Sequence, residues 1–296
     1  MALTLSPPLP LELEREIFEL CAHSWPSGIP KLMRVAHRVK NWVHPLLYRT
    51  LVVYHPLYDD PNDAGPFWIT IERVASAISA HPALFSSAAR HLFVSLFDDT
   101  DVATIGTLLA ACTGIEDLFL LVLHHTWISV IALLPLKRFY GPCRGLISIV
   151  HPSDIAFLRL THLKLTDYIP SEAINLWTDF LASLPALTHL AFDDLQAISL
   201  CSSLLETCKT LRVLIMLFNF STQLARRDHT HDALLAQDGR FVCVLYKNYI
   251  QDWLMGARWG LDSWKRAEAF IAKRRAGEID PLQIDVLEDE SLAVLA

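Results

Sequence analysis

Histidine is the residue type whose spacing here comes closest to a reactive or metal-binding site. Two close pairs occur, His124-His125 and His229-x-His231, and only the second pair has carboxylates beside it. A neutral imidazole can bind zinc, but a site needs three or four protein ligands at defined spacing. Neither pair meets that requirement in the sequence. We therefore expect no metal and no metal-dependent chemistry.

Motifs of the common catalytic sites are also missing. The sequence holds no G-x-S-x-G, no glycine-rich phosphate loop and no H-E-x-x-H. Its six cysteines are scattered and form no C-x-x-C, which is typical of reduced, buried thiols in an intracellular protein. We expect a protein that is not an enzyme and uses no cofactor.

A recurring apolar template dominates the chain from about residue 85. Each copy reads apolar, two variable residues, apolar, one variable residue, apolar, and the clearest copies are residues 160–165 and 187–192. The central apolar anchors recur every 21 to 27 residues, at Leu92, Leu118, Phe139, Leu163, Leu190 and Leu214. Leucine-rich repeats have periods of about 20–29 residues, each a strand followed by a helix.

Helical patterns lie near or between these copies, with apolar residues at three- and four-residue spacing. They cover residues 69–80, 102–112, 127–134, 173–184 and 197–208. We therefore predict an α/β fold: a short helical head followed by an irregular leucine-rich-repeat solenoid. Its parallel strands would line the concave face, its helices would lie outside, and a helical segment would cap the C-terminal end.

The variable residues between the anchors form the best binding hypothesis. Side chains alternate along a strand, so these residues should point away from the core onto the inner curved surface. Exposed aromatic clusters mark interaction sites, and repeat arrays bind partners through their concave face. The alternative is that loops or the C-terminal helix cover this surface. The predicted target-binding residues are Phe93, Asp117, Phe119, Arg138, Tyr140, His162, Lys164 and His189.

Residues 9–48 form a second, separate unit in the sequence. Leu9, Leu13, Ile17 and Leu20 recur at helical spacing, and Pro10 can open such a helix. A second amphipathic helix is expected over residues 31–43. So small a unit buries little core and needs a partner or a neighbouring domain. A capping subdomain and a docking module both fit the pattern.

These residues carry a family resemblance. The pattern Leu9-Pro10-x-Glu12-Leu13-x-x-x-Ile17-Phe18, with Leu32-Met33-x-Val35 and Trp42 after it, resembles the F-box. The exit segment at residues 45–49 and the end of the chain, Asp252-Trp253 and Trp264-x-Arg266, resemble fungal (basidiomycete) F-box-like proteins. Val39 and Lys40 depart from the usual Arg-Trp side of the motif.

The resemblance implies a substrate-recognition adaptor of a Skp–cullin–F-box ubiquitin ligase. The head would dock a Skp-type adaptor subunit and thereby the cullin ligase core, while the repeats bind an unknown target protein. The alternative is a non-ligase interaction scaffold whose F-box-like head is only a structural cap. The residues implied for adaptor binding are Pro10, Leu13, Ile17, Phe18, Leu32, Val35 and Trp42.

The sequence divides into five segments. We expect a head at 1–53, a linker and capping helix at 54–84, the array at 85–240, a strand and helical cap at 241–280, and a mobile acidic tail at 281–296.

The net charge of −7 argues against bulk nucleic-acid binding. Residues 118–136 hold no charged side chain, but a buried strand and helix explain them better than a membrane span. The N-terminus shows no signal peptide, so we expect a cytoplasmic or nuclear protein.

Overall fold

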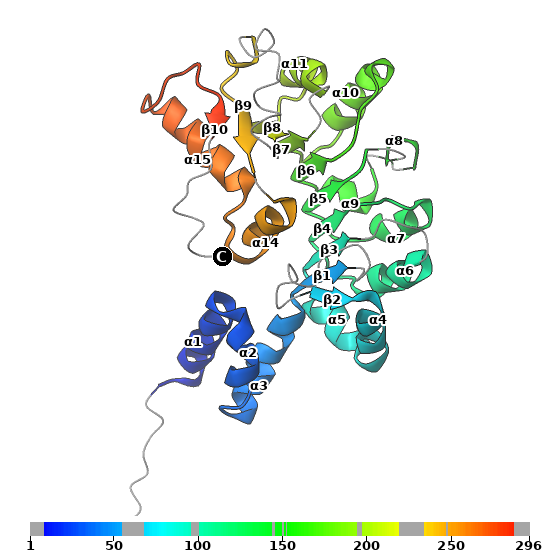
Figure 1. The fold of residues 1–296 in the computed structure, drawn as a ribbon, viewed down its shortest axis with the longest axis vertical. Helices are drawn as coiled ribbons and strands as arrows, with labels where there is room; N and C mark the ends of the chain where they lie inside the picture. The colour runs from blue at the N-terminus through cyan, green and yellow to red at the C-terminus, as the bar shows by residue number, and fades with distance from the viewer. Residues whose placement is uncertain are drawn as a thin grey trace, which may run out of the picture.

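A single parallel sheet runs through most of the protein. The computed structural model describes residues 9–54, 68–95, 101–143, 146–149, 151, 153–193, 197–218, 234–246 and 248–286. Its 10-stranded sheet has the order β10-β9-β8-β7-β6-β5-β4-β3-β1-β2, and every neighbouring pair is parallel (Figure 1). The strands are β1 (Thr50–Tyr54), β2 (Trp68–Thr70), β3 (His91–Ser95), β4 (Asp117–Leu120), β5 (Arg138–Gly141), β6 (His162–Leu165), β7 (His189–Phe192), β8 (Val213–Phe218), β9 (Phe241–Leu245) and β10 (Asp285–Val286).

The apolar template places successive strands in the same register. The predicted anchors pair directly from β3 to β8, beginning with Leu92 against Leu118 and Leu118 against Phe139, and all six are fully buried. The backbone repeats the same bond before most of these strands. The carbonyl of Lys137, for example, accepts from the N–H groups of Thr161 at 2.8 Å and His162 at 3.0 Å. The regular recurrence of the anchors in the sequence therefore corresponds to a row of anchors that pair from strand to strand across the sheet.

Helices cover one face of the sheet and bury the anchors beneath them (Figure 1). The expected helices at 69–80, 102–112, 173–184 and 197–208 are present with ends within two residues, whereas 127–134 is a short turn and helix. This outer layer consists of α4 (Ile71–Ala80), α5 (Pro82–Ala88), α6 (Val102–Ala111), η4 (His125–Trp127), α7 (Ile128–Ile131), α8 (Leu146–Ile149), α9 (Ile155–Leu158), η5 (Ser171–Ala173), α10 (Ile174–Ala182) and α11 (Ile198–Thr207).

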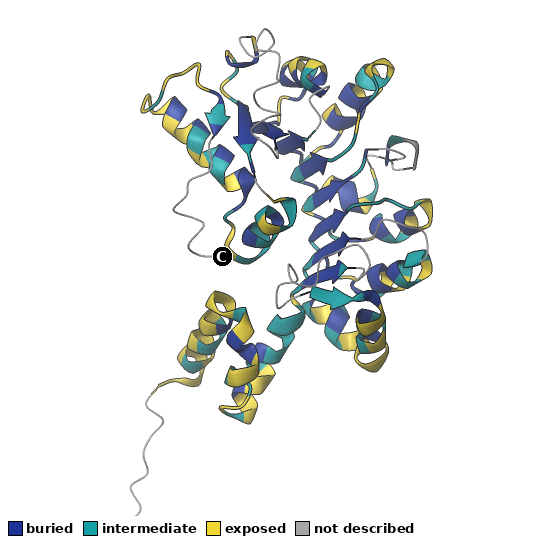
Figure 2. Ribbon diagram, in the orientation of Figure 1, coloured by how far each residue is buried: buried dark blue, intermediate teal, exposed yellow. Residues whose placement is uncertain are grey.

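The head consists of one 14-residue helix and four short ones at one end of the sheet: α1 (Leu11–Ser24), η1 (Pro26–Gly28), α2 (Ile29–Leu32), α3 (His37–Val43) and η2 (His44–Tyr48). The single helix expected at 31–43 is wrong. Extended backbone at Ala36, with φ −160° and ψ 157°, separates α2 from α3. A small core joins these pieces, formed by Ala22, Ile29, Val39 and Val43. Figure 2 shows how much of the head's surface is exposed compared with the sheet.

The C-terminal part returns across the face that the outer helices leave open (Figure 1). It contains β9, α14 (Tyr249–Trp259), α15 (Ser263–Arg275) and β10. Gly260, at φ 66°, ends α14, and Asp262 caps α15 by accepting from the N–H of Lys265. Gly260 therefore divides the expected helical cap into two helices.

Two expected boundaries need correction. The sheet extends beyond the predicted array at 85–240: β1 and β2 continue it at one end, and β9, the strand expected after residue 240, continues it with β10 at the other. Residues 281–286 are not a mobile tail: β10 pairs with β9, and the N–H of Cys243 donates to the carbonyl of Ile284 at 2.8 Å. Residues 55–67 of the expected linker and residues 287–296 of the expected tail lie outside the described residues.

Residues 118–136, the uncharged segment, fold into β4, η4 and α7 rather than one long helix. A search of the described residues finds no helix with the length and apolar character that a membrane crossing requires.

Candidate functional site

The predicted target-binding residues lie in two adjacent columns on one face of the sheet. Asp117, Arg138, His162 and His189 pair in register across β4 to β7, and the second column holds the remaining four. In that second column, the ring centroids of Phe93 and Phe119 are 4.7 Å apart, and those of Phe119 and Tyr140 are 5.3 Å apart. The shared face that the repeat spacing predicts is therefore present.

The expectation that this face is open to a partner is wrong. Phe93 is 0% exposed, Phe119 2% and Tyr140 5%, because α14 and α15 lie over them. Asp117, Lys164 and His189 are also buried, and Arg138 and His162 are half-buried. The aromatic column forms a second core with the apolar sides of these helices, which removes its surface from water. The alternative of a covering C-terminal helix therefore describes the structure.

Hydrogen bonds and an ion pair fix the covering helices to the polar members of the columns. On α14, Trp253 Nε1–H donates to Asp117 Oδ1 at 2.8 Å. On α15, Trp264 Nε1–H donates to the hydroxyl of Tyr140 at 2.9 Å. A buried polar group without such a partner would destabilise the fold. These hydrogen bonds explain how charged and polar side chains of the two columns can be buried beneath α14 and α15.

Asp262, the residue directly before α15, forms an ion pair with Arg138 in the first column. Arg138 Nη1 lies 2.7 Å from Asp262 Oδ2, and Asp262 is 3% exposed. Sequence reasoning did not identify Asp262 as a site residue. Its available signal was local: an Asp directly before a helical pattern is a typical N-cap. Its second role, as the partner of Arg138, depends on a chain separation of 124 residues.

Two histidines stack beneath α15. The rings of His162 and His189 are 4.0 Å apart and 8° from parallel, and the ring of Trp264 meets both edge-on. Burial, then the neighbouring His189 and Arg138, lowers the pKa of His162 to about 2. Burial also lowers the pKa of His189, although Glu268, 3.2 Å away, opposes this. Both rings are therefore neutral at physiological pH and pack as core.

Lys164 is the most deeply covered cation of the columns. Its Nζ lies 4.6 Å from the ring centroid of Tyr246 and 5.8 Å from that of Phe119. Burial lowers its pKa, while the charges of Asp193 and Asp252 act to raise it. The aromatic faces stabilise the cation in place of water, so its charge is not presented to a partner.

The residues predicted for adaptor docking divide into two groups. Leu13 is 47% exposed, Ile17 46% and Val35 61%, and Pro10 is also exposed. The other three are partly buried and pack against the head's own core: Phe18, Leu32 and Trp42. The first group can contact a partner directly, whereas the second holds the head together.

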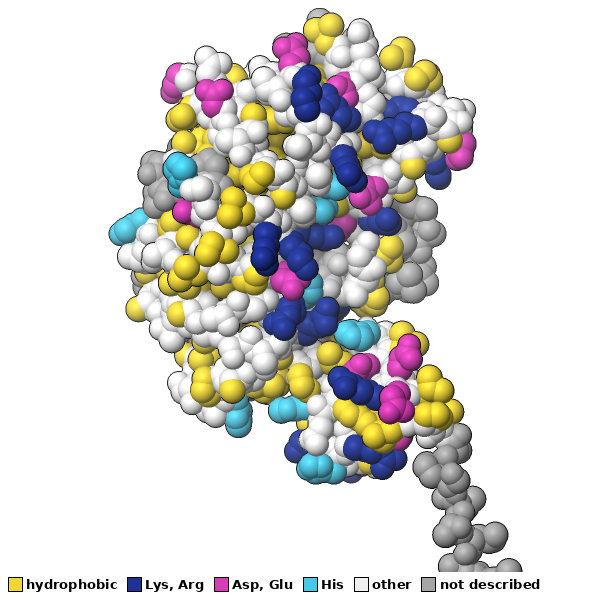
Figure 3. All heavy atoms as spheres, turned by 180° about the vertical axis from the view of Figure 1, so that it is seen from behind, with side chains coloured by type: hydrophobic (Ala, Val, Ile, Leu, Met, Phe, Trp, Pro, Cys, Tyr) yellow, Lys and Arg dark blue, Asp and Glu magenta, His cyan; other side chains and the backbone are white. Residues whose placement is uncertain are grey.

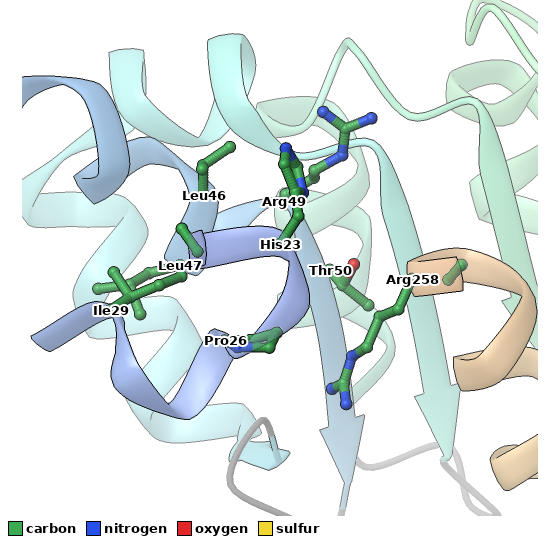
Figure 4. A pocket seen from close by; sticks show the side chains of 10 residues that line it. His23, Pro26, Ile29, Leu46, Leu47, Arg49, Thr50 and Arg258 are labelled. Atoms are coloured by element: carbon green, nitrogen blue, oxygen red, sulfur yellow. The ribbon is translucent and has the colours of Figure 1, made fainter. Parts of the chain in front are cut away.

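A small cavity lies where the head, β1 and α14 meet (Figure 4). Its volume is about 90 Å³, and its lining includes His23, Arg49 and Arg258. Burial, then the charge of Arg49, lowers the pKa of His23, and burial lowers the pKa of Arg258 to about 10. Small-molecule sites usually have volumes of about 300–1,000 Å³, so this space fits a packing gap at a joint.

The histidine pairs give no metal centre in the part of the chain that is described. The rings of His124 and His125 are 4.2 Å apart, and no group of three potential ligands occurs among the described residues. His229 and His231 lie outside the described residues. Of the cysteines, Cys21 is exposed and the other five are buried and free.

A comparison with models of known protein families finds no match, and a search of curated proteins likewise finds none.

Proposed function

We propose that this chain is a substrate-recognition adaptor of a Skp–cullin–F-box ubiquitin ligase, and that residues 9–48 dock the Skp-type subunit. One observation carries the proposal: a stripe of large apolar side chains, on α1 and directly before it, that stays about half exposed or more. We call Leu9, Leu13, Ile17 and Leu20 the head stripe, and they are 42%, 47%, 46% and 64% exposed. It matches the apolar face of the F-box-like motif.

The energetics support a missing partner. Fully burying one Leu or Ile side chain contributes about 1.5–3 kcal/mol, so four half-exposed ones leave several kcal/mol available. Contiguous exposed apolar patches in a soluble protein often mark interaction surfaces. The opposite side of α1 already contacts the head's core through Phe18 and Ala22, and this leaves the head stripe free for another molecule.

We also infer that the sheet and its outer helices are an irregular leucine-rich-repeat array. The shared register of the anchors from Leu92 to Leu214 and the repeated carbonyl bonds support this inference. The target protein would then bind outside the covered columns, because α14 and α15 occupy the concave face. Catalysis would be proximity: the ligase core brings activated ubiquitin to a bound target.

A second function is favoured by the partly buried members of the docking set. Because Phe18, Leu32 and Trp42 pack inside the head, they would be apolar in a purely structural cap as well. The C-terminal end of the head also packs against the outer helices, since the ring centroids of Tyr48 in η2 and Phe85 in α5 lie 5.2 Å apart. On this alternative, the chain is a protein-interaction scaffold without a ligase.

The test is capture of a Skp-type subunit by the full chain. Ile17→Asp places a charge in the head stripe and should weaken capture by about thirtyfold, or ~2 kcal/mol. Leu11→Asp is the matched control, because Leu11 is 56% exposed on the other side of the same helix and should leave capture unchanged. Trp42→Ala is a poorer probe, since it also removes packing from the head's core.

Thermal unfolding of both variants shows whether the head remains folded. Loss of capture with Ile17→Asp alone, at unchanged Tm, supports the adaptor. If the wild-type chain captures no Skp-type subunit, or if Ile17→Asp captures it as well as wild type does, the ligase proposal fails and the scaffold is favoured.

A further inference from the structure

The edge of the sheet where the strands begin carries an unusual density of positive charge. All strands are parallel, so their first residues lie along one edge. Arg49, Arg90, Lys137 and Arg212 directly precede β1, β3, β5 and β8. Arg159 and Lys209 lie in the turns that lead into β6 and β8. We call these six residues the basic ridge.

This ridge contrasts with the chain as a whole, whose net charge is −7. Figure 3 shows Lys and Arg side chains gathered in a band along one face of the molecule. Three acids near this edge lie against basic side chains, whereas Glu206, exposed at the end of α11, forms no ion pair with a described residue. Glu116 lies 2.6 Å from Lys137, Asp238 2.7 Å from Arg240, and Glu268 3.2 Å from Lys265.

Four members of the basic ridge are available to another molecule. Arg49, Arg159, Lys209 and Arg212 are exposed, and none of them forms an ion pair with a described residue. Arg90 is different, because its guanidinium donates to the carbonyl of Ala89 at 2.8 Å. Like charges held in a row repel one another, and an external anion relieves that repulsion.

We propose that the basic ridge binds an extended acidic segment of another protein. Six strand spacings of about 4.8 Å separate β1 from β8, which gives a ridge of roughly 29 Å. An extended chain of about nine residues spans that length at ~3.3 Å per residue. A short acidic segment contacts the ridge alone. A long nucleic acid or an anionic membrane also meets the acidic remainder of the surface, which repels it.

The head stripe takes no part in this surface, so the inference goes beyond the proposed adaptor role. In an adaptor, the ridge would select targets that carry acidic segments; in a scaffold, it would select partners of the same kind. Failure of peptide binding would leave Skp-type capture unaffected, and failure of capture would leave peptide binding unaffected.

Fluorescence anisotropy of a labelled peptide of alternating Glu and Ser, about 12 residues long, tests the proposal with the full chain. The ridge variant combines Arg159→Glu, Lys209→Glu and Arg212→Glu. We expect it to bind the peptide about tenfold or more weakly than wild type. Added salt should weaken wild-type binding, because exposed charges are screened.

The control variant changes the net charge equally at a distance from the basic ridge, through Arg34→Glu, Lys40→Glu and Arg73→Glu. All three side chains are exposed, on the head and on α4. We expect peptide binding within about twofold of wild type. A ridge variant with Gln in place of Glu should show an intermediate loss, and Tm measurements on every variant verify folding.

Three results would overturn the inference. They are no binding of the peptide to wild type at low salt, an equal loss of binding in the ridge and control variants, and a loss of binding in the ridge variant that occurs only together with a lowered Tm. A single-stranded oligothymidylate or vesicles containing phosphatidylserine serve as competing probes. If either binds wild type more tightly than the peptide and is equally sensitive to the ridge variant, the surface recognises another class of molecule and the proposal is wrong.

Discussion

Replacing Trp253 by Phe tests whether α14 is held on the sheet by the contact described above. Trp253 is 2% exposed, and its Nε1–H donates to Asp117 Oδ1 at 2.8 Å. A hydrogen bond to a charged group contributes about 1.5–3 kcal/mol, and the smaller ring loses about 1 kcal/mol of burial. We expect a loss of roughly 2–4 kcal/mol in the free energy of unfolding.

Thermal unfolding followed by circular dichroism measures this loss. At about 2 °C per kcal/mol for a chain of this size, the Tm should fall by roughly 4–8 °C. Trp259→Phe is the matched control, because the same substitution is made on the same helix at a side chain that is 38% exposed. It should change stability by about 0.5 kcal/mol or less.

A double-mutant cycle with Asp117→Ala separates the bond from the packing. If the bond carries the effect, the two substitutions should show a coupling energy of about 1–2 kcal/mol. Equal Tm values for Trp253→Phe and Trp259→Phe would refute the reasoning, because α14 would then add nothing by covering the sheet. A coupling near zero would show that packing alone holds the helix.

Three further outcomes follow from individual groups. The contribution of the neutral His162 and His189 rings to the free energy of unfolding should be fully present above pH 6.5 and be lost as the pH drops toward 2. The reason is that burial lowers the folded pKa of His162 to about 2 and that of His189 below 6.5. The loss approaches ~1.4 kcal/mol per pH unit for His162, and His162→Gln should therefore reduce the slope of urea midpoints against pH; an unchanged slope contradicts this assignment. Gly260→Ala should destabilise by about 1 kcal/mol because φ is 66° there, whereas Gly239→Ala, which has open space and no positive φ, should have little effect in the same urea titration. A thiol reagent should label Cys21 first, because it is the exposed cysteine; mass spectrometry of briefly treated protein would contradict this if a buried cysteine reacted equally fast.

The sheet could be predicted because its information is local and repeated. Each anchor, such as Leu163 or Leu190, sits in a short template that specifies a strand and its buried side. The spacing between templates leaves room for one helix, and equal units stack in one register. The same reasoning identified the head helix and its apolar stripe, since a stripe at helical spacing needs only a few turns of sequence.

Other features depended on contacts between distant segments. The sequence specifies that Phe119 and Tyr140 share a face, but whether water reaches that face depends on where α14 and α15 pack. Trp264 donates a hydrogen bond to Tyr140, which is 124 residues away in the chain, and no periodicity in the sequence predicts that contact. The division of 31–43 into two helices likewise depends on packing in the head's core.

By itself, the sequence determined the strand register, the outer helices and an apolar stripe on the head, because each rests on side-chain periodicity within one segment. Only the tertiary structure decided which apolar surfaces stay open. An aromatic column and a helix stripe are equally apolar in sequence, and burial depends on whether another part of the chain covers them. Here α14 and α15 cover the column around Phe119, while Ile17 and its neighbours stay exposed.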